Sequence, residues 1–279
     1  MKTRRPQSAH QWLIILLGLL MALVMLVLPL ALIFSKAFSE GWSVLVQNLS
    51  EGYMQHAIGL TVFTALISVP INIIFGIAIA WCVTRYEFRG RRLLMTLVDI
   101  PFSMSPVVAG MCYLALLGTE TVVGQWLYGK DVQVIFAWPG ILLVTLFVTS
   151  PYVARILIPL LQAQGTEEEI AAVSLGASGW KILTRVTLPN IKWALLYGAV
   201  ITNARAVGEF GAVSVVSGTI MNQTLTLPLL VEQLNNDYKT AAAFTAAALL
   251  ACIAILTLLL KSLMEYIQKK KLEEAQRAV

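Results

Sequence analysis

Two opposite charges stand four residues apart inside a stretch that is otherwise apolar. Arg205 and Glu209 lie in segment 193–217, with small residues around them. This spacing places both side chains on one face of a helix, within ion-pairing distance. An unpaired charge at the centre of a bilayer costs at least about 2.5–3.5 kcal/mol, so the pair is expected to face the interior of a helix bundle. It is either a structural brace for this helix or a site where Arg205 compensates an anion in transit.

The stretch Gly124–Asp131 comes close to a phosphate-binding P-loop but departs from it in two ways. Asp131 stands where the loop needs a Ser or Thr for magnesium, and its carboxylate would repel phosphate. The stretch also lies in a loop between apolar segments rather than between a strand and a helix. No other Walker-like stretch or nucleophile–base pair is present in the sequence, so we expect no catalytic residues and no ATP hydrolysis by this chain alone.

The thiols and imidazoles offer no metal site. Cys82, Cys112 and Cys252 sit in separate apolar segments without a C-x-x-C pair, so they are expected to be buried structural thiols. His10 and His56 are far apart, and neither has a cysteine or an acidic cluster nearby. We therefore expect no bound metal.

The connection 162–190, between two apolar segments, is long and patterned. Thr166 can cap a helix, and Glu169 three residues later would complete a capping box. The glutamates of the first turn suit the helix dipole. Gly176 can end this helix with a positive φ. The pattern predicts a short helix followed by a tight turn.

The second half of this connection predicts another short helix. Ser178 can cap it, and Pro189 limits it. Ala171, Ala172 and Gly176 would leave a surface of small residues that another protein could approach closely. From these features alone, a simple amphipathic loop is an equal alternative.

The elements that position these residues follow from composition. The chain of 279 residues is 58% hydrophobic and 13% charged, whereas a soluble domain has roughly 25% charged residues. Lipid must therefore be the solvent for much of it. No stretch outside the apolar segments is long enough for a separate core, so we predict one membrane domain over 1–279.

Several segments reach the roughly 20 residues that a helix needs to cross about 30 Å of hydrocarbon. We predict an all-α, polytopic membrane protein with six transmembrane helices. The first segment is longer than the apolar core of a typical signal peptide, so we expect it to be retained. The segments are 12–34, 57–84, 93–117, 134–161, 193–217 and 241–260.

Lys and Arg favour one set of loops. The termini and the second-to-third and fourth-to-fifth connections hold most of them, whereas the other loops hold only Lys36, Lys130 and Lys239. This excess predicts that both termini lie in the cytoplasm, and it explains the net charge without nucleic acid. Arg155, near the end of the fourth segment, can snorkel to the interface and is a weaker candidate for an anion path. Asp99 is read as structural, because a carboxylate would repel an anion.

The spacing within connection 162–190 resembles the cytoplasmic EAA loop in the permease subunits of bacterial ABC importers. Ala171 and Ala172, Gly176, and the stretch Val186-Thr187-Leu188-Pro189 fall in the register of that motif. One position departs from it. Ile170 occupies the place of the motif's glutamate and Glu169 comes one residue early, which shifts or weakens the acidic contact.

Two further stretches look like the sulfate and molybdate branch of these permeases. Asn203–Ala212 looks like its fifth-helix motif, and Asp99–Gly110 looks like its proline-containing third helix. From Trp12 to about Ile267 the chain is similar to a permease subunit of bacterial sulfate/thiosulfate ABC importers.

The resemblance implies the type I permease fold and a subunit that moves sulfate into the bacterial cytoplasm across the inner membrane. It implies a loop that docks on a separate ATP-hydrolysing subunit, so this chain would bind no cofactor and ATP would be used by the partner. The partners implied are a homologous permease subunit, two ATP-binding subunits, a periplasmic sulfate-binding protein, sulfate and membrane lipid, but no nucleic acid. The coupling residues implied are Glu169, Ala171, Ala172, Gly176, Leu188 and Pro189.

Alternatives stay open at this point. Thiosulfate could be a second substrate, and the chain could serve molybdate or another oxyanion instead of sulfate. An ATP-independent channel or secondary transporter is a reading from another class, which the loop spacing disfavours because such proteins have no ATPase to dock. The partner permease could be a second gene product or another copy of this chain.

Overall fold

The computed structural model describes residues 9–277, and it describes side chains over residues 12–266. All regular elements in this part are helical, including two short π-helical turns, so the all-α class is confirmed. In chain order they are α1 (Ala9–Ala22), η1 (Leu23–Val27), α2 (Leu28–Ala37), α3 (Trp42–Ser50), α4 (Gly52–Arg85), α5 (Arg91–Ser103), α6 (Pro106–Leu117), α7 (Val122–Tyr128), α8 (Trp138–Thr149), α9 (Pro151–Gln164), α10 (Glu167–Ser174), α11 (Gly179–Ile182), η2 (Leu183–Thr187), α12 (Leu188–Val207), α13 (Gly211–Ser217), α14 (Leu227–Asn236) and α15 (Thr240–Arg277).

Four helical runs are long and apolar enough to cross a membrane. They correspond to the first, second, fourth and sixth segments expected from the sequence, with bounds that differ by a few residues. Each is mostly apolar on its outward surface, as a helix in lipid must be. These runs are Trp12–Ala37, Gly52–Arg85, Trp138–Gln164 and Thr240–Tyr266.

The third and fifth expected segments are broken rather than continuous. α5 and α6 form an angle of 109°, and the run ending in α12 meets α13 at 50°. With each bent pair counted as one span, the described part of the chain has up to six, as expected. The first break comes at Ser105, whose extended backbone (φ −63°, ψ 135°) precedes Pro106. A proline disfavours the helical conformation in the residue before it, which explains the break there.

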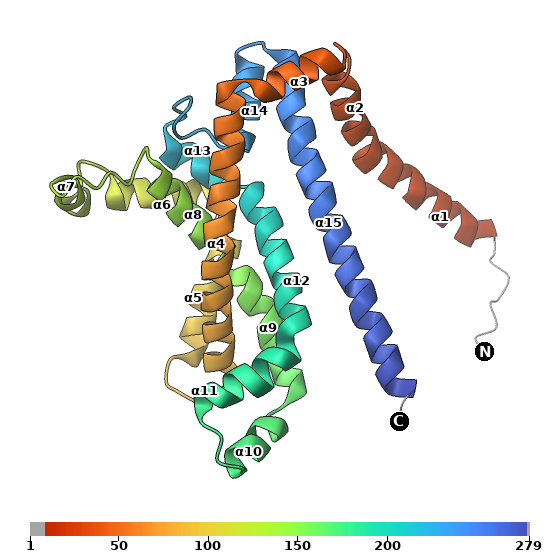
Figure 1. Ribbon diagram of the computed structural model, residues 1–279, viewed down its shortest axis with the longest axis vertical. Coiled ribbons are helices and arrows are strands. Elements are labelled where there is room, and N and C mark those ends of the chain that lie inside the picture. The colour runs from red at the N-terminus through yellow and green to blue at the C-terminus, as the bar shows by residue number, and fades with distance from the viewer. Residues whose placement is uncertain (1–8, 278–279) are drawn as a thin grey trace.

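The helices α4, α9 and α12 pack side by side, and α9 and α12 lie beside the lower half of α4 in Figure 1. A glycine permits the closest approach. A Cβ atom added to Gly76 of α4 would lie 2.5 Å from the Cβ of Val153 in α9. Around this contact lies a buried cluster of Ala80, Val153, Leu157, Leu161 and Ile191.

The two broken spans pack against each other near their breaks. A Cβ atom on Gly110 of α6 would come within 2.7 Å of the carbonyl oxygen of Ala212 in α13. One on Gly211 would come within 3.2 Å of the Pro106 side chain. The start of α6 therefore lies against the start of α13.

The helix after Ser178 is not limited by Pro189, contrary to expectation. α11, η2 and α12 form one helical run from Gly179 to Val207. Pro189 has no N–H to donate to the carbonyl four residues before it. The π-helical turn η2 ends immediately before this point, and the Leu188 N–H donates to the Leu183 carbonyl in place of an α-helical bond.

The first span leans away from the bundle (Figure 1). In its most apolar stretch no residue is buried within the chain, and contact with the rest is made through α2. The cysteines also face outward more than expected: Cys112 and Cys252 are exposed, and Cys82 is half-buried. The expectation of buried thiols was wrong, because apolar residues of a membrane protein are stable on the outer surface that faces lipid.

Candidate functional site

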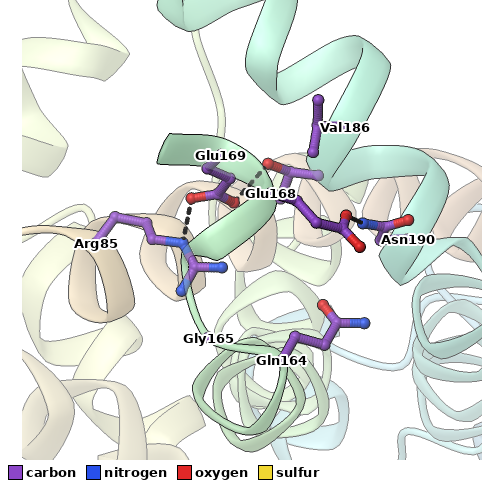
Figure 2. Close-up of a pocket in the computed structure, with 8 residues that line it drawn as sticks. Arg85, Gln164, Gly165, Glu168, Glu169, Val186 and Asn190 are labelled. Atoms are coloured by element: carbon purple, nitrogen blue, oxygen red, sulfur yellow. Dashed lines mark hydrogen bonds and ion pairs between the residues drawn. The ribbon is translucent and has the colours of Figure 1, made fainter. Parts of the chain in front are cut away.

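The patterned connection forms the end of the molecule that carries α10 and α11 (Figure 1). A cavity of about 230 Å³ lies between α10, the ends of α4 and α9, and the start of α12. Its lining is mainly polar and combines two loops that are far apart in the sequence (Figure 2). The lining residues are Arg85, Gln164, Gly165, Glu168, Glu169, Val186, Thr187 and Asn190.

Glu169 is the centre of this site. Its carboxylate forms an ion pair with Arg85, with 2.6 Å between Oε2 and Nε, and both side chains are largely buried. The Thr187 hydroxyl donates to the other carboxylate oxygen over 2.8 Å. Arg85 also donates to the Leu161 carbonyl at 3.2 Å. One carboxylate therefore joins α10 to α4 and η2, and Figure 2 shows it turned toward Arg85. Through the Leu161 carbonyl, Arg85 also reaches α9.

The expected capping box does not form. Thr166 stands at the N-cap of α10, but its side chain accepts no hydrogen bond from the helix. Glu169 is held by Arg85 and Thr187 instead, because a charged hydrogen-bonded partner is stronger than a backbone N–H at an exposed helix end. Ser178 likewise precedes α11 without a side-chain cap. Arg85 was missed as a site residue, since its position directly after a span suggested only a topology signal.

A second contact holds the other side of α10. The Asn190 amide donates to the Glu168 carboxylate, and Leu188 packs against the buried cluster around Leu157 and Ile191. Pro189 is exposed between them. The Leu-Pro end of the motif therefore anchors the connection to the bundle.

Gly176 ends α10 as predicted, with a φ of +79°. The Ala177 N–H donates to the Ala172 carbonyl, and the Gly176 N–H donates to the Val173 carbonyl. This pair of bonds is the Schellman motif, which needs a left-handed residue at the Gly176 position. No other atom lies within 4 Å of a Cβ built on Gly176. The glycine is required by backbone conformation and not by crowding.

Four large apolar side chains are exposed at the turn between α10 and α11, beside the exposed Glu167, Glu168 and Lys181. Ile170 is 60% exposed, Val173 59%, Leu175 89% and Trp180 73%. Ala171 lies beside them and is exposed, while Ala172 is half-buried. We call Ile170, Val173, Leu175 and Trp180 the tip patch. Exposed apolar side chains that gather beside charged residues are typical of protein contact surfaces. Their spacing around Ala171 could have revealed them in the sequence.

The ion pair expected within the fifth segment is present. Arg205 Nη1 and Glu209 Oε2 lie 2.7 Å apart, and the side chains are 28% and 1% exposed. The geometry differs from expectation in one respect. Glu209 does not continue the helix of Arg205, because α12 ends at Val207 and Glu209 lies in the break before α13.

Glu209 has a second partner that the sequence reading missed. Its Oε1 accepts a hydrogen bond of 3.0 Å from the backbone N–H of Ala212, in the first turn of α13. One carboxylate oxygen thus binds the end of one helix, and the other binds the start of the next. The pair holds the bend of this span, with α13 resting on α6.

The chain matches a family model described as binding-protein-dependent transport system inner membrane component, over residues 72–273. The match includes α10, the tip patch, and both ion pairs described above. It begins within α4 and ends within α15, and so leaves out the first span.

Two relatives from Escherichia coli (strain K12) and one solved structure are similar over most of the chain. The sulfate transport system permease protein CysW is 53% identical over 273 residues, which cover 98% of this chain and 94% of CysW. The permease protein CysT of the same system is 33% identical and covers 86% and 87%. The bacterial alginate ABC transporter, crystallised in complex with an alginate pentasaccharide-bound periplasmic protein, has a chain with a TM-score of 0.75 at 17% identity, covering 93% of both chains.

These comparisons confirm the resemblance drawn from the sequence. The sulfate-type permease is confirmed by the relatives. The importer permease fold that the resemblance implied is confirmed by the solved structure.

Proposed function

The chain belongs to the binding-protein-dependent transport system inner membrane components, and on this premise we propose that it is the CysW-type subunit through which a bacterial ABC importer moves sulfate. The observation that carries the proposal is the 53% identity to CysW over nearly the whole of both chains. It includes the broken spans and the α10 connection, which are the parts that serve transport. Thiosulfate, an oxyanion of the same charge and similar shape, is included in the proposal as a second substrate.

The tip patch is the surface that would contact the ATP-binding subunit and be moved when that subunit binds ATP. Ile170 stands where the motif has a glutamate, and it faces outward, whereas the Glu169 carboxylate is turned inward to Arg85. We expect the contact with the ATP-binding subunit to be apolar at this position. The Arg85–Glu169–Thr187 contacts would then carry the displacement of α10 into α4 and α12.

The comparisons support two of the remaining partners. CysW and CysT are both permease proteins of one sulfate system in Escherichia coli, which supports pairing of this chain with a homologous, different permease. The alginate transporter was crystallised with a periplasmic protein, which supports delivery of sulfate by a binding protein. Two ATP-binding subunits would supply hydrolysis, and this chain would bind no cofactor.

The basic loops support the orientation. Arg85 lies against α10, so the second-to-third and fourth-to-fifth connections meet at one end of the molecule. At the opposite end, Lys239 and Glu40 line a common groove, which brings together two of the loops poor in Lys and Arg. We propose that the α10 end lies in the cytoplasm together with both termini.

The test is complementation of a strain that lacks its own CysW-type permease but retains the other subunits. Expression of this chain is expected to restore uptake of labelled sulfate, and detergent extraction is expected to co-purify an ATP-binding subunit. Excess unlabelled thiosulfate should compete with sulfate, and molybdate should compete less. Strong competition by molybdate alone would assign another oxyanion. Uptake without any ATP-binding subunit would favour a channel or secondary transporter.

A further inference from the structure

A third pair of opposite charges joins two spans away from the sites already described. Asp99 of α5 and Arg155 of α9 form an ion pair, with 2.8 Å between Oδ1 and Nε. Unlike Glu169 and Glu209, both side chains are about half exposed, at 45% for Asp99 and 52% for Arg155. The pair therefore lies on the outer surface of this chain.

Aromatic rings hold the arginine in place. The guanidinium of Arg155 lies 4.3 Å from the centre of the Phe102 ring. Phe102 contacts Tyr152 edge to face, with 4.9 Å between ring centres. Both stacking and ion pairing restrict the guanidinium plane, and they prepare it to bind a further anion.

Among the described residues, one nitrogen of this guanidinium has a hydrogen-bond partner. Within the described residues, the Nε of Arg155 donates to Asp99, and neither Nη atom has a hydrogen-bond partner. The Nη groups carry most of the donors of an arginine side chain, and they match the spacing of two oxygens on a carboxylate or a tetrahedral oxyanion.

The position of the pair determines what can cover it. Asp99 lies eight residues into α5, about 12 Å from its start, and Arg155 lies about 14 Å before the end of α9 at 1.5 Å per residue. The long arginine side chain can extend toward the end of α9, whereas the aspartate side chain is too short to span the distance to the charged start of α5. A half-exposed carboxylate at this depth does not face lipid, so it faces water or protein.

We propose, resting on the sulfate-import function above, that Asp99, Phe102 and Arg155 form a polar surface of the water-filled path, where Arg155 binds the divalent oxyanion as it passes. The unused Nη groups bind two oxygens of the anion. Asp99 remains on Nε and reduces the net positive charge, so that the anion is held weakly enough to leave again. This role makes the carboxylate useful in an anion path instead of merely repulsive.

The first experiment measures sulfate imported per ATP hydrolysed by the complete transporter in proteoliposomes, with its binding protein inside or outside as the orientation requires. Arg155→Gln is expected to lower this ratio about tenfold, the usual effect of losing a charge-assisted hydrogen bond. Stimulation of ATP hydrolysis by the loaded binding protein should persist. Arg155→Lys and Asp99→Asn should both retain a larger share of the ratio than Arg155→Gln.

A matched control exists on α15. Lys261 pairs with Glu265 at 3.9 Å and lies 5.3 Å from the Tyr197 ring, so it has the same two kinds of contact. Lys261→Gln is expected to leave the ratio unchanged. Equal ratios in Arg155→Gln and Lys261→Gln would overturn the proposal, as would a parallel loss of uptake and ATP hydrolysis. If the unmutated chain imports no sulfate, the proposed function fails first.

The second experiment tests for water directly and stands even if Arg155→Gln does not assemble. Ser103, one turn beyond Asp99 and exposed, is replaced by cysteine after the native cysteines are changed to alanine. A negatively charged methanethiosulfonate reagent is expected to modify Ser103→Cys in the assembled transporter, and sulfate delivered by the binding protein should slow the reaction. A variant that keeps only Cys252, at an exposed apolar position of α15, should not react. No modification at position 103 would place this surface against a partner subunit and overturn the proposal.

Discussion

Glu169 and Glu209 are both ion-paired to an arginine, yet they lie in opposite kinds of surroundings. Glu169 is 15% exposed, beside a cavity at the end of the molecule, and its partner Arg85 comes from a distant helix. Glu209 is 1% exposed inside the bundle, and its partner is in the preceding turn of the chain. The first pair determines where α10 sits relative to the bundle. The second shapes a bend within one span.

The difference has an energetic consequence. A charge beside a polar cavity can be solvated there when its partner is removed, whereas a charge sealed inside the bundle is left without an opposite charge. Mutations at the α10 end should therefore change transport more than folding. Mutations at the bend should change folding first.

The largest effect is expected from Arg205→Ala. It leaves the Glu209 carboxylate unpaired in the interior, which costs about 3–5 kcal/mol for a buried pair. Glu209→Ala should cost less, because the Arg205 side chain is 28% exposed and is therefore less enclosed than the Glu209 carboxylate. Membrane abundance and the thermal unfolding midpoint in detergent measure both. Equal losses in the two single variants would contradict the asymmetry.

Removing both charges tests whether the Arg205–Glu209 pair only stabilises the bend or whether Arg205 also contacts the transported anion. The double alanine variant lacks the unpaired charge, so membrane abundance should return. Its stability should remain lower by about 1 kcal/mol, because the cap on α13 is lost. For a brace, sulfate uptake returns with it, and that is the outcome we expect. Uptake should also survive the exchange of the two charges. Abundance without uptake in both variants would instead place Arg205 in the path.

The next largest effect is expected at the α10 end. Glu169→Ala should lower sulfate uptake about tenfold, as loss of a charge-assisted contact does, while membrane abundance stays close to that of the unmutated chain. Arg85→Ala should do the same, and exchange of the two charges should restore part of the uptake. Glu168→Ala, which removes only the exposed contact to Asn190, is the matched control. Normal uptake by Glu169→Ala would show that α10 is held by other contacts.

How much of this was predictable depended on distance along the chain. Gly176 and the Arg205–Glu209 pair were found because their partners lie within one or two helical turns, where spacing determines geometry. Arg85 and Glu169 could not be paired, since nothing local indicates which helix ends meet. The same limit hid the contact between Asp99 and Arg155.

The spans were predictable and their breaks were not. Pro106 was visible in the third segment, but a proline in a membrane helix can also be absorbed as a slight kink when neighbours satisfy the free carbonyl. Pro189 shows the opposite error, because a π-helical turn carried the helix through a position where a stop was expected. Which outcome occurs depends on the packing partners of each proline.

A smaller effect is expected from the backbone at Gly176. Gly176→Val forces a branched side chain into the left-handed region, at a cost of about 1–2 kcal/mol. Uptake should fall several-fold while the protein remains in the membrane. Gly176→Asn should retain more uptake, because asparagine tolerates this conformation. Gly179→Val is a control with the same added volume in equally open space but without a positive φ. A loss at Gly179 as large as that at Gly176 would point to surface contact instead of conformation.

The smallest effect is expected at Lys130, which forms no ion pair with a carboxylate among the described residues. Its Nζ lies 4.1 Å from the centre of the Trp126 ring, a contact worth about 0.5–1 kcal/mol when exposed. Lys130→Ala should leave uptake unchanged, and the purified chain alone should hydrolyse no ATP with or without this mutation. ATP turnover that disappears in Lys130→Ala would restore the Gly124–Asp131 stretch as a phosphate site.

The unbroken helical run from Gly179 to Val207 gives the molecule a lever arm. One end carries Trp180 of the tip patch, and the other ends at the Arg205–Glu209 bend. Its 29 residues span about 43 Å at 1.5 Å per residue, so a rigid tilt of about 10° about one end would displace the other by about 7 Å. This displacement is close to the radius of a helix with its side chains. A small rotation at the tip would thus be enough to move α13 out of its packing contact with α6.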